Sequence, residues 1–155
     1  MKLTNNEIGR GFTDVIVLTS ADLAAIAAAG GTKTIGLIPK GGGIRGASIS
    51  TSRTFVTTGT STAVAANGAV SVGISGTAAK HIASAVPPAT VDTAARFNSG
   101  SGWTTGIPVV IDIPTTADIP VILTVGAGTT TGAYSALDGQ IVITLDIIDP
   151  VSQAV

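Results

Sequence analysis

Apolar and polar residues alternate along several short stretches of this chain, which is the pattern of half-buried β-strands. The clearest case is residues 140–148, where one face would be aliphatic and the other would carry Gln140, Thr144 and Asp146. Residues 107–113 alternate in the same way, and prolines at both ends predict an edge strand or strand ends, because proline cannot donate to a sheet. Further strands are predicted at residues 14–18, 33–38, 44–50, 54–57, 69–74 and 119–125.

Two short helices are predicted between these strands. Thr19, with Asp22 three residues later, has the form of a capping box, and the helix that it opens would end at Gly30 and Gly31. A second helix is predicted over residues 78–86, where Ala79, Ile82, Ala83 and Val86 recur at helical spacing and two prolines follow. Both helices would cover an open end or edge of the sheets.

Together these elements predict an all-β fold, an antiparallel β-sandwich of the jelly-roll type with about eight strands and two short helices. The sandwich would span residues 14–148, with an N-terminal arm at residues 1–13 and a C-terminal tail at residues 149–155. Only 3% of the residues are aromatic, so the core must consist of Val, Ile, Leu and Ala. Two glycine-rich stretches, residues 98–106 and 126–139, are predicted as long loops.

The low content of charged residues favours a part of an assembly over a free enzyme. Charged residues make up 11% of the chain and the formal net charge is −1, whereas a soluble domain carries about 25% charged residues. Such a chain has little charge to keep a monomer dispersed, which favours an architectural role. Its Lys and Arg residues form no patch, so no nucleic-acid partner is expected. No membrane segment or secretory signal is expected either, and the absence of cysteine excludes disulfides and thiolate metal sites.

Candidate chemistry in the sequence is sparse. His81 is the only histidine, and we expect it on the polar side of the second helix without a role. Residues 41–43 are three glycines without the lysine of a phosphate-binding loop, so a turn between strands is favoured. The aspartates at 112, 118, 146 and 149 are expected to be solvated charges at strand edges. No catalytic residue, metal or cofactor is therefore predicted.

Trp103 is the one residue for which the sequence suggests a contact surface. It lies in a glycine-rich stretch close to Arg96 and Phe97, and tryptophan is enriched at binding hot spots. The alternative is that its ring closes the end of the core. Both interpretations are left open by the sequence.

The order of the predicted elements is similar to that of a known protein family. It runs from the helix start at residues 19–23 (TSADL) through residues 34–41 (TIGLIPKG), a strand with Ile44 and Ile49, residues 70–76 (VSVGISG) and 78–83 (AAKHIA), to the closing strand at residues 139–148. This order resembles the small jelly-roll cement, or decoration, proteins on the capsids of tailed bacteriophages, over about residues 14–148.

The resemblance implies a structural virion protein that is made in the host cytoplasm and binds the outer capsid surface as a homodimer or homotrimer. Its partners would be the major capsid protein and its own copies, and binding would stabilise the shell. Extended termini of such proteins reach neighbours, so the alternating Leu3, Ile8 and Phe12 are candidate contacts. Arg96, Phe97 and Trp103 complete the set of candidate capsid or oligomer contacts.

Two other functions compete with this hypothesis. A carbohydrate- or receptor-binding module on the virion surface would use Trp103 as an aromatic platform. A hydrolase would use the carboxylates of Asp112 and Asp146 as a catalytic pair. The resemblance itself brings no catalytic residues.

Overall fold

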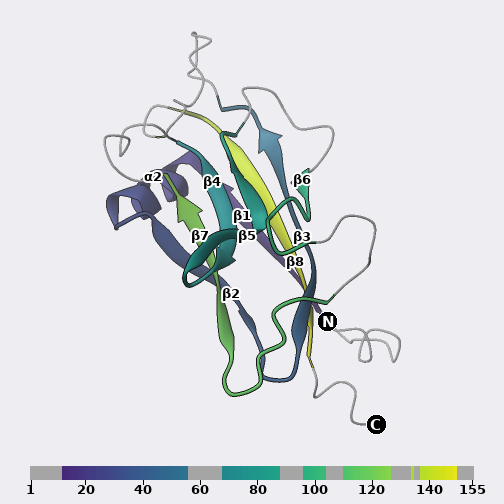
Figure 1. Ribbon diagram of the computed structural model, residues 1–155. Helices are drawn as coiled ribbons and strands as arrows, with labels where there is room; N and C mark the ends of the chain where they lie inside the picture. The colour runs from purple at the N-terminus through teal and green to yellow at the C-terminus, as the bar shows by residue number, and fades with distance from the viewer. Residues whose placement is uncertain are drawn as a thin grey trace.

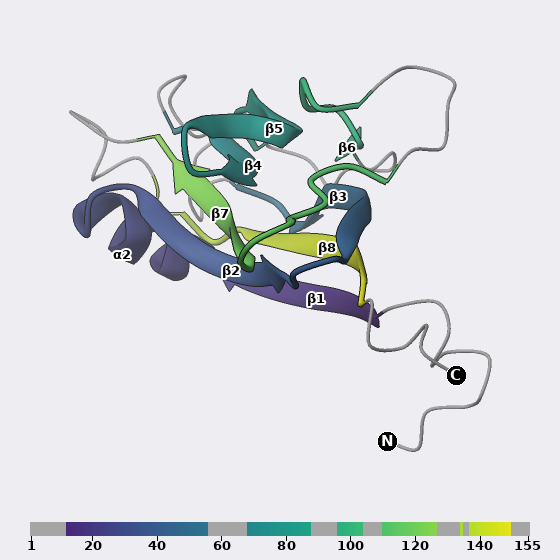
Figure 2. The same cartoon turned by 60° about the horizontal axis from the view of Figure 1, so that its bottom comes forward.

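The computed structural model describes residues 12–55, 68–87, 96–103, 110–126, 134 and 137–149. Within them the chain forms two antiparallel four-stranded sheets and one helix (Figure 1). The first sheet has the order β1-β8-β3-β6 and the second β2-β7-β4-β5. Figure 2 shows the second sheet lying over the first as a separate layer. The prediction of an all-β sandwich is confirmed at this level.

Eight strands make up the two sheets of the described chain. They are β1 (Phe12–Thr19), β2 (Thr32–Ile38), β3 (Gly43–Arg53), β4 (Val70–Ile74), β5 (Thr77–Ala85), β6 (Arg96–Phe97), β7 (Ile119–Val125) and β8 (Gln140–Ile148). Hydrogen bonding joins β1 to β8, β2 to β7, β3 to β6 and β4 to β5, and it also joins β8 to β3 and β7 to β4. Because Phe12 pairs with Ile147, the chain enters and leaves the sandwich at one end.

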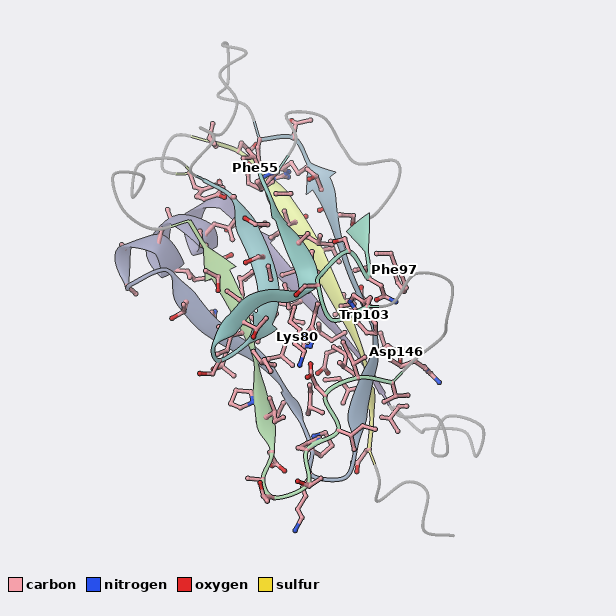
Figure 3. The ribbon with its side chains drawn as sticks, in the orientation of Figure 1. Phe55, Lys80, Phe97, Trp103 and Asp146 are labelled. Atoms are coloured by element: carbon pink, nitrogen blue, oxygen red, sulfur yellow. The ribbon has the colours of Figure 1, made fainter. Side chains whose placement is uncertain are left out.

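The core lies between the sheets and is aliphatic, as the composition predicts. The alternation in β8 is complete: Ile141, Ile143, Leu145 and Ile147 are fully buried, and the residues between them are half-buried on the outer face. Opposite them, Val121, Leu123 and Val125 of β7 are also fully buried. Near the far end of the sandwich, Phe55 meets the ring of Tyr134 edge to face, with centroids 6.0 Å apart (Figure 3).

Helix α2 (Ser20–Ala28) begins where the sequence predicts it. The Thr19 backbone N–H donates to Asp22 Oδ2 at 2.8 Å, and the Asp22 N–H donates to Thr19 Oγ1 at 3.2 Å, which completes a capping box. These hydrogen bonds from Thr19 lower the pKa of the Asp22 carboxyl. Gly30 and Gly31, with φ of 103° and 78°, end the helix in a conformation that suits glycine.

The second predicted helix is wrong, because residues 78–85 of it belong to strand β5 instead. The β4–β5 hairpin turns at Gly76, whose φ is 80°, and Val72 then pairs with Ile82. A Cβ at Gly73 would lie 2.1 Å from the Thr77 carbonyl oxygen, so only glycine permits this close approach. Pairing with β4 overrides the helical preference of the alanines, and the described chain therefore has one helix rather than two.

Other boundaries differ in detail. The strand predicted at residues 107–113 is reduced, among its described residues 110–113, to a single bridge between Ile111 and Ile44. β3 ends at Arg53, so the described residues 54 and 55 form no strand. β1 begins at Phe12, inside the predicted arm, and the rest of that arm lies outside the described residues, as do residues 150–155 of the tail. The three glycines at 41–43 lie at a turn between strands, as predicted: Gly41 belongs to the turn and Gly43 begins β3.

We predict that Ile143→Ala lowers the free energy of unfolding by about 2 to 5 kcal/mol, because it leaves a cavity at the centre of the core. Val142→Ala, the matched control, truncates the neighbouring side chain on the outer face and should cost less than half as much. Urea denaturation followed by circular dichroism measures both. Equal losses for the two variants would contradict the assignment of the faces of β8.

Candidate functional site

Residues 96–103 close one side of the sandwich by joining the edges of both sheets. Strand β6 pairs with β3 in the first sheet, through Phe97 opposite Ser48. The chain then follows the free edge of β5 in the second sheet, where Gly100 N–H donates to the His81 carbonyl at 3.0 Å and Gly102 N–H donates to the Lys80 carbonyl at 2.8 Å. An exposed edge that would otherwise invite pairing with another chain is thereby covered.

An ionic cluster lies beneath this segment. Lys80 Nζ is in direct contact with Asp112 Oδ1, and His81 Nε2 lies 2.6 Å from Asp112 Oδ2. The His81 side chain is fully buried, that of Asp112 is 4% exposed, and that of Lys80 is 27% exposed. Figure 3 shows Lys80 and Trp103 at mid-height of the sandwich. One carboxylate is thus held between an amine and an imidazole, largely away from water.

The backbone around Asp112 explains how an aspartate reaches this position. Ile111 and Ile44 exchange two backbone hydrogen bonds of 3.0 Å, which fix the segment to the start of β3. Asp112 then takes a φ of 53°, in the left-handed region that is uncommon for residues with a side chain. Such a conformation costs free energy, which the surrounding contacts must offset.

Trp103 completes the cover over His81. Its indole N–H donates to the His81 carbonyl at 2.7 Å, and the two rings lie 6.2 Å apart. Burial lowers the pKa of the His81 imidazole below its ordinary value of 6.5, while the adjacent Asp112 carboxylate acts in the opposite direction and Lys80 adds a smaller lowering. Nδ1 of His81 is buried without a hydrogen-bond partner within the described chain.

Two predictions about these residues are wrong. His81 is a buried strand residue and not a surface residue of a helix, because residues 98–103 cover the edge on which it lies. Asp112 is not a solvated charge, because its backbone turns the carboxylate toward β5. Nothing in the local sequence marks either residue, since the contact joins positions 31 residues apart.

Two other aspartates, Asp146 and Asp118, accept hydrogen bonds from partners of their own. Asp146 accepts two hydrogen bonds from Arg45, at 2.8 and 3.0 Å, and Asp118 accepts one from the Lys40 backbone N–H at 2.9 Å. Within the described residues, no group of three His, Cys, Asp or Glu side chains is placed to hold a metal ion. No helix in that same part of the chain is long and apolar enough to cross a bilayer.

The outer surface of the first sheet is a second candidate site. Pairing across its four strands aligns Val15, Thr144, Ser48 and Phe97 in one row, since each is the register partner of the next. Val17, Val142 and Ser50 form the row beside it. We call these seven residues the hydroxyl face. Val15 is 62% exposed and Phe97 63% exposed, so the face offers aliphatic and aromatic groups among uncharged hydroxyls.

The six contacts predicted from sequence are only partly placed. Leu3 and Ile8 lie outside the described residues, while Phe12 and Arg96 lie on β1 and β6. Phe97 belongs to the hydroxyl face, whereas Trp103 is half-buried against the core. The sequence missed Val15 and Val17, although the alternation in β1 could have identified them as the outer residues of an exposed strand.

We predict that acidification destabilises the protein through His81. The folded state binds the imidazole proton less tightly than the unfolded chain does, so stability is full above the unfolded pKa of 6.5 and falls as the pH drops below it. The slope is at most about 1.4 kcal/mol per pH unit for one proton. Urea unfolding between pH 7.5 and 5.5 measures this slope, and the His81→Gln variant should lack the pH dependence.

NMR titration of this single histidine tests the same shift without a variant. Its pKa should lie below 6.5, and a higher value would contradict the lowering by burial.

No family model matches the chain, and no curated protein matches it. A chain in the solved structure of the cyanophage Pam1 capsid asymmetric unit is similar in fold, with a TM-score of 0.52 and 16% sequence identity. The similarity covers 91% of this chain and 87% of that chain, so the two are close in length. At this identity the likeness shows a shared fold.

Proposed function

We propose that this protein is a structural component of a phage virion, which binds the outer surface of the capsid as an oligomer and stabilises contacts between major capsid subunits. The observation that carries the proposal is the likeness to a chain of a cyanophage capsid asymmetric unit. The match spans 91% of this chain and 87% of that chain, so the likeness extends over most of both.

The strand order supports a jelly roll as the specific architecture of the sandwich. β1 pairs with β8, β2 with β7, β3 with β6 and β4 with β5, so the first half of the strands pairs in reverse order with the second half. This arrangement is what results when one long antiparallel hairpin is wound into two sheets. Double-sheet jelly rolls are common in virus shells, which agrees with the proposed location.

The hydroxyl face is the surface that we propose for capsid contact. Ser, Thr and Val side chains lose little on transfer out of water compared with charged groups, whose desolvation opposes binding. Arg45 and Asp146, on strands of the same sheet, already form an ion pair with N–O distances of 2.8 and 3.0 Å. An uncharged sheet face with Phe97 as an exposed aromatic anchor suits contact with another protein surface.

Stabilisation would then follow from mass action. A protein that binds the assembled shell and not the separated subunits shifts the equilibrium toward the shell. An oligomer that engages several subunits at once gains avidity without any single strong contact. Low net charge is compatible with this mode, because the contact depends on fit over many copies and not on electrostatic attraction.

No described feature favours the competing functions over this one. The Trp103 indole N–H already donates to the His81 carbonyl, and its ring is half-buried, so it offers no open platform to a sugar. Asp112 and Asp146 have separate cationic partners, Lys80 and Arg45, instead of forming a carboxylate pair. We accordingly propose a non-enzymatic role.

We predict that Val15→Asp weakens binding to capsids of its own phage about a hundredfold or more, because an unpaired carboxylate buried in the contact costs several kcal/mol. The matched control is Leu37→Asp on β2 of the other sheet, another exposed aliphatic position, which should bind as the parent does. Capsids prepared without the protein are incubated with each variant, and bound copies and the temperature of shell disruption are measured. If parent protein neither binds nor raises that temperature, the proposed function is wrong.

We also predict that the isolated protein is a dimer or trimer. Light scattering coupled to size-exclusion chromatography measures the mass directly. A monomer at high micromolar concentration would contradict the oligomeric part of the proposal while leaving capsid binding open to the preceding experiment.

A further inference from the structure

The cluster of Lys80, His81 and Asp112 is more than the fold requires for stability. Removing a lysine ammonium and a carboxylate from water is costly, and such pairs are often no more stable than apolar replacements. Here the carboxylate is 4% exposed and is held by a residue in the left-handed backbone region. A fully buried imidazole touches its second oxygen. An amine, a carboxyl carbon and a proton carrier are therefore assembled at one point.

We propose that Lys80 and Asp112 become joined by an intramolecular amide bond between Nζ and the side-chain carbonyl carbon Cγ, with His81 as the proton carrier. The product is an isopeptide cross-link within one chain. The inference does not depend on capsid binding, because it uses only groups inside the sandwich.

The reaction balances without any co-reactant. The lysine ammonium and the aspartate carboxylate contain together the atoms of one amide and one water molecule. Nζ loses a proton and attacks Cγ, which forms the C–N bond. Oδ2 receives two protons from the nitrogen, one of them relayed through His81 Nε2, and the C–Oδ2 bond breaks as water leaves. Nζ keeps one hydrogen, Oδ1 remains as the amide oxygen, and His81 ends in its starting state.

Several features of the site favour this step over a permanent ion pair. Lys80 Nζ already contacts Asp112 Oδ1, and holding reactants together in this way supplies much of the entropy that an uncatalysed condensation lacks. His81 Nε2 lies 2.6 Å from Oδ2, the oxygen that must leave. Trp103 and the backbone of Gly100 and Gly102 cover this edge of β5, which limits access of water to the finished amide.

The position of the bond gives it a structural purpose. Lys80 lies on β5, the edge strand of the second sheet, while Asp112 follows the residue that bridges to Ile44 at the start of β3 in the first sheet. A covalent link between them would tie the two layers together across 32 positions of sequence. The chain contains no cysteine, so no disulfide can serve this purpose.

Intact mass measured under denaturing conditions tests the proposal on the full chain. The purified protein should be lighter than its sequence mass by one water molecule. Lys80→Arg is the matched control, because arginine keeps the positive charge beside Asp112 but its guanidinium does not form this amide. That variant should have the full sequence mass and, by circular dichroism, the parent fold.

Trypsin locates the bond. The sequence has cleavage sites after Arg53, Lys80 and Arg96 and none beyond Arg96, so complete digestion of an unlinked chain releases residues 97–155 as a separate fragment. A cross-linked chain resists cleavage after Lys80 and keeps residues 54–96 attached to residues 97–155 in a reducing, denaturing gel. Fragmentation of the joined species should place the link at Lys80 and Asp112.

Three results would overturn the proposal. A parent protein of full sequence mass would leave only an ion pair at the site. A missing water that persists in Lys80→Arg would place the dehydration elsewhere, for instance at the Asp138-Gly139 sequence. Separate fragments after digestion would exclude the cross-link directly.

The role of His81 is tested by the rate of bond formation. In cell-free synthesis followed over time, His81→Gln should lose water at least tenfold more slowly than the parent, and an unchanged rate would show that His81 takes no part in the reaction.

Discussion

The structure depends on the burial of an aliphatic face on each sheet against the other. In β8 every second residue is fully buried, and the residues between them point to the outer surface. A shift of one residue in the pairing would exchange the two sets and place Thr144 and Asp146 in the core, so the register is fixed strongly. The same constraint creates the hydroxyl face: once Ile143 and Ile49 face inward, Thr144 and Ser48 must align on the outside.

The buried ion pair of Lys80 and Asp112 lies where this alternation fails. At the side closed by residues 96–103, the sheets are joined by single hydrogen bonds and by side chains and not by a continuous ladder. The space between β5 and the segment after Ile111 holds Lys80, His81 and Asp112 in place of aliphatic side chains. Burial of these charges is tolerated because the Lys80 ammonium and the His81 imidazole both contact the Asp112 carboxylate. Removing one of the three groups would leave a buried charge without its partner, which is strongly destabilising.

The local sequence pattern was sufficient to predict the strands whose two faces differ most in hydrophobicity. Strands β7 and β8 and helix α2 follow directly from alternation and capping. Strand β5 could not be predicted in this way, because its alanines fit a helix equally well and only pairing with β4 decides between the two. The contact between His81 and Asp112 and the row from Val15 to Phe97 depend on the pairing of distant strands, and that information is absent from any short stretch of sequence.

Three ion pairs join charges of the described residues: Arg45 with Asp146, Arg53 with Asp138, and Lys80 with Asp112. The formal net charge of the whole chain is only −1. A partner cannot then be drawn from a distance by electrostatic steering, which needs a net field. The proposed recognition of a capsid would therefore depend on short-range fit, which requires a surface that keeps its shape. An aliphatic sandwich with only 3% aromatic residues and no disulfide has few strong anchors of its own. The proposed covalent bond between its layers would hold the outer face in shape where the proposed function has it meet a capsid, so the cross-link and the contact surface would then serve the same mechanical end.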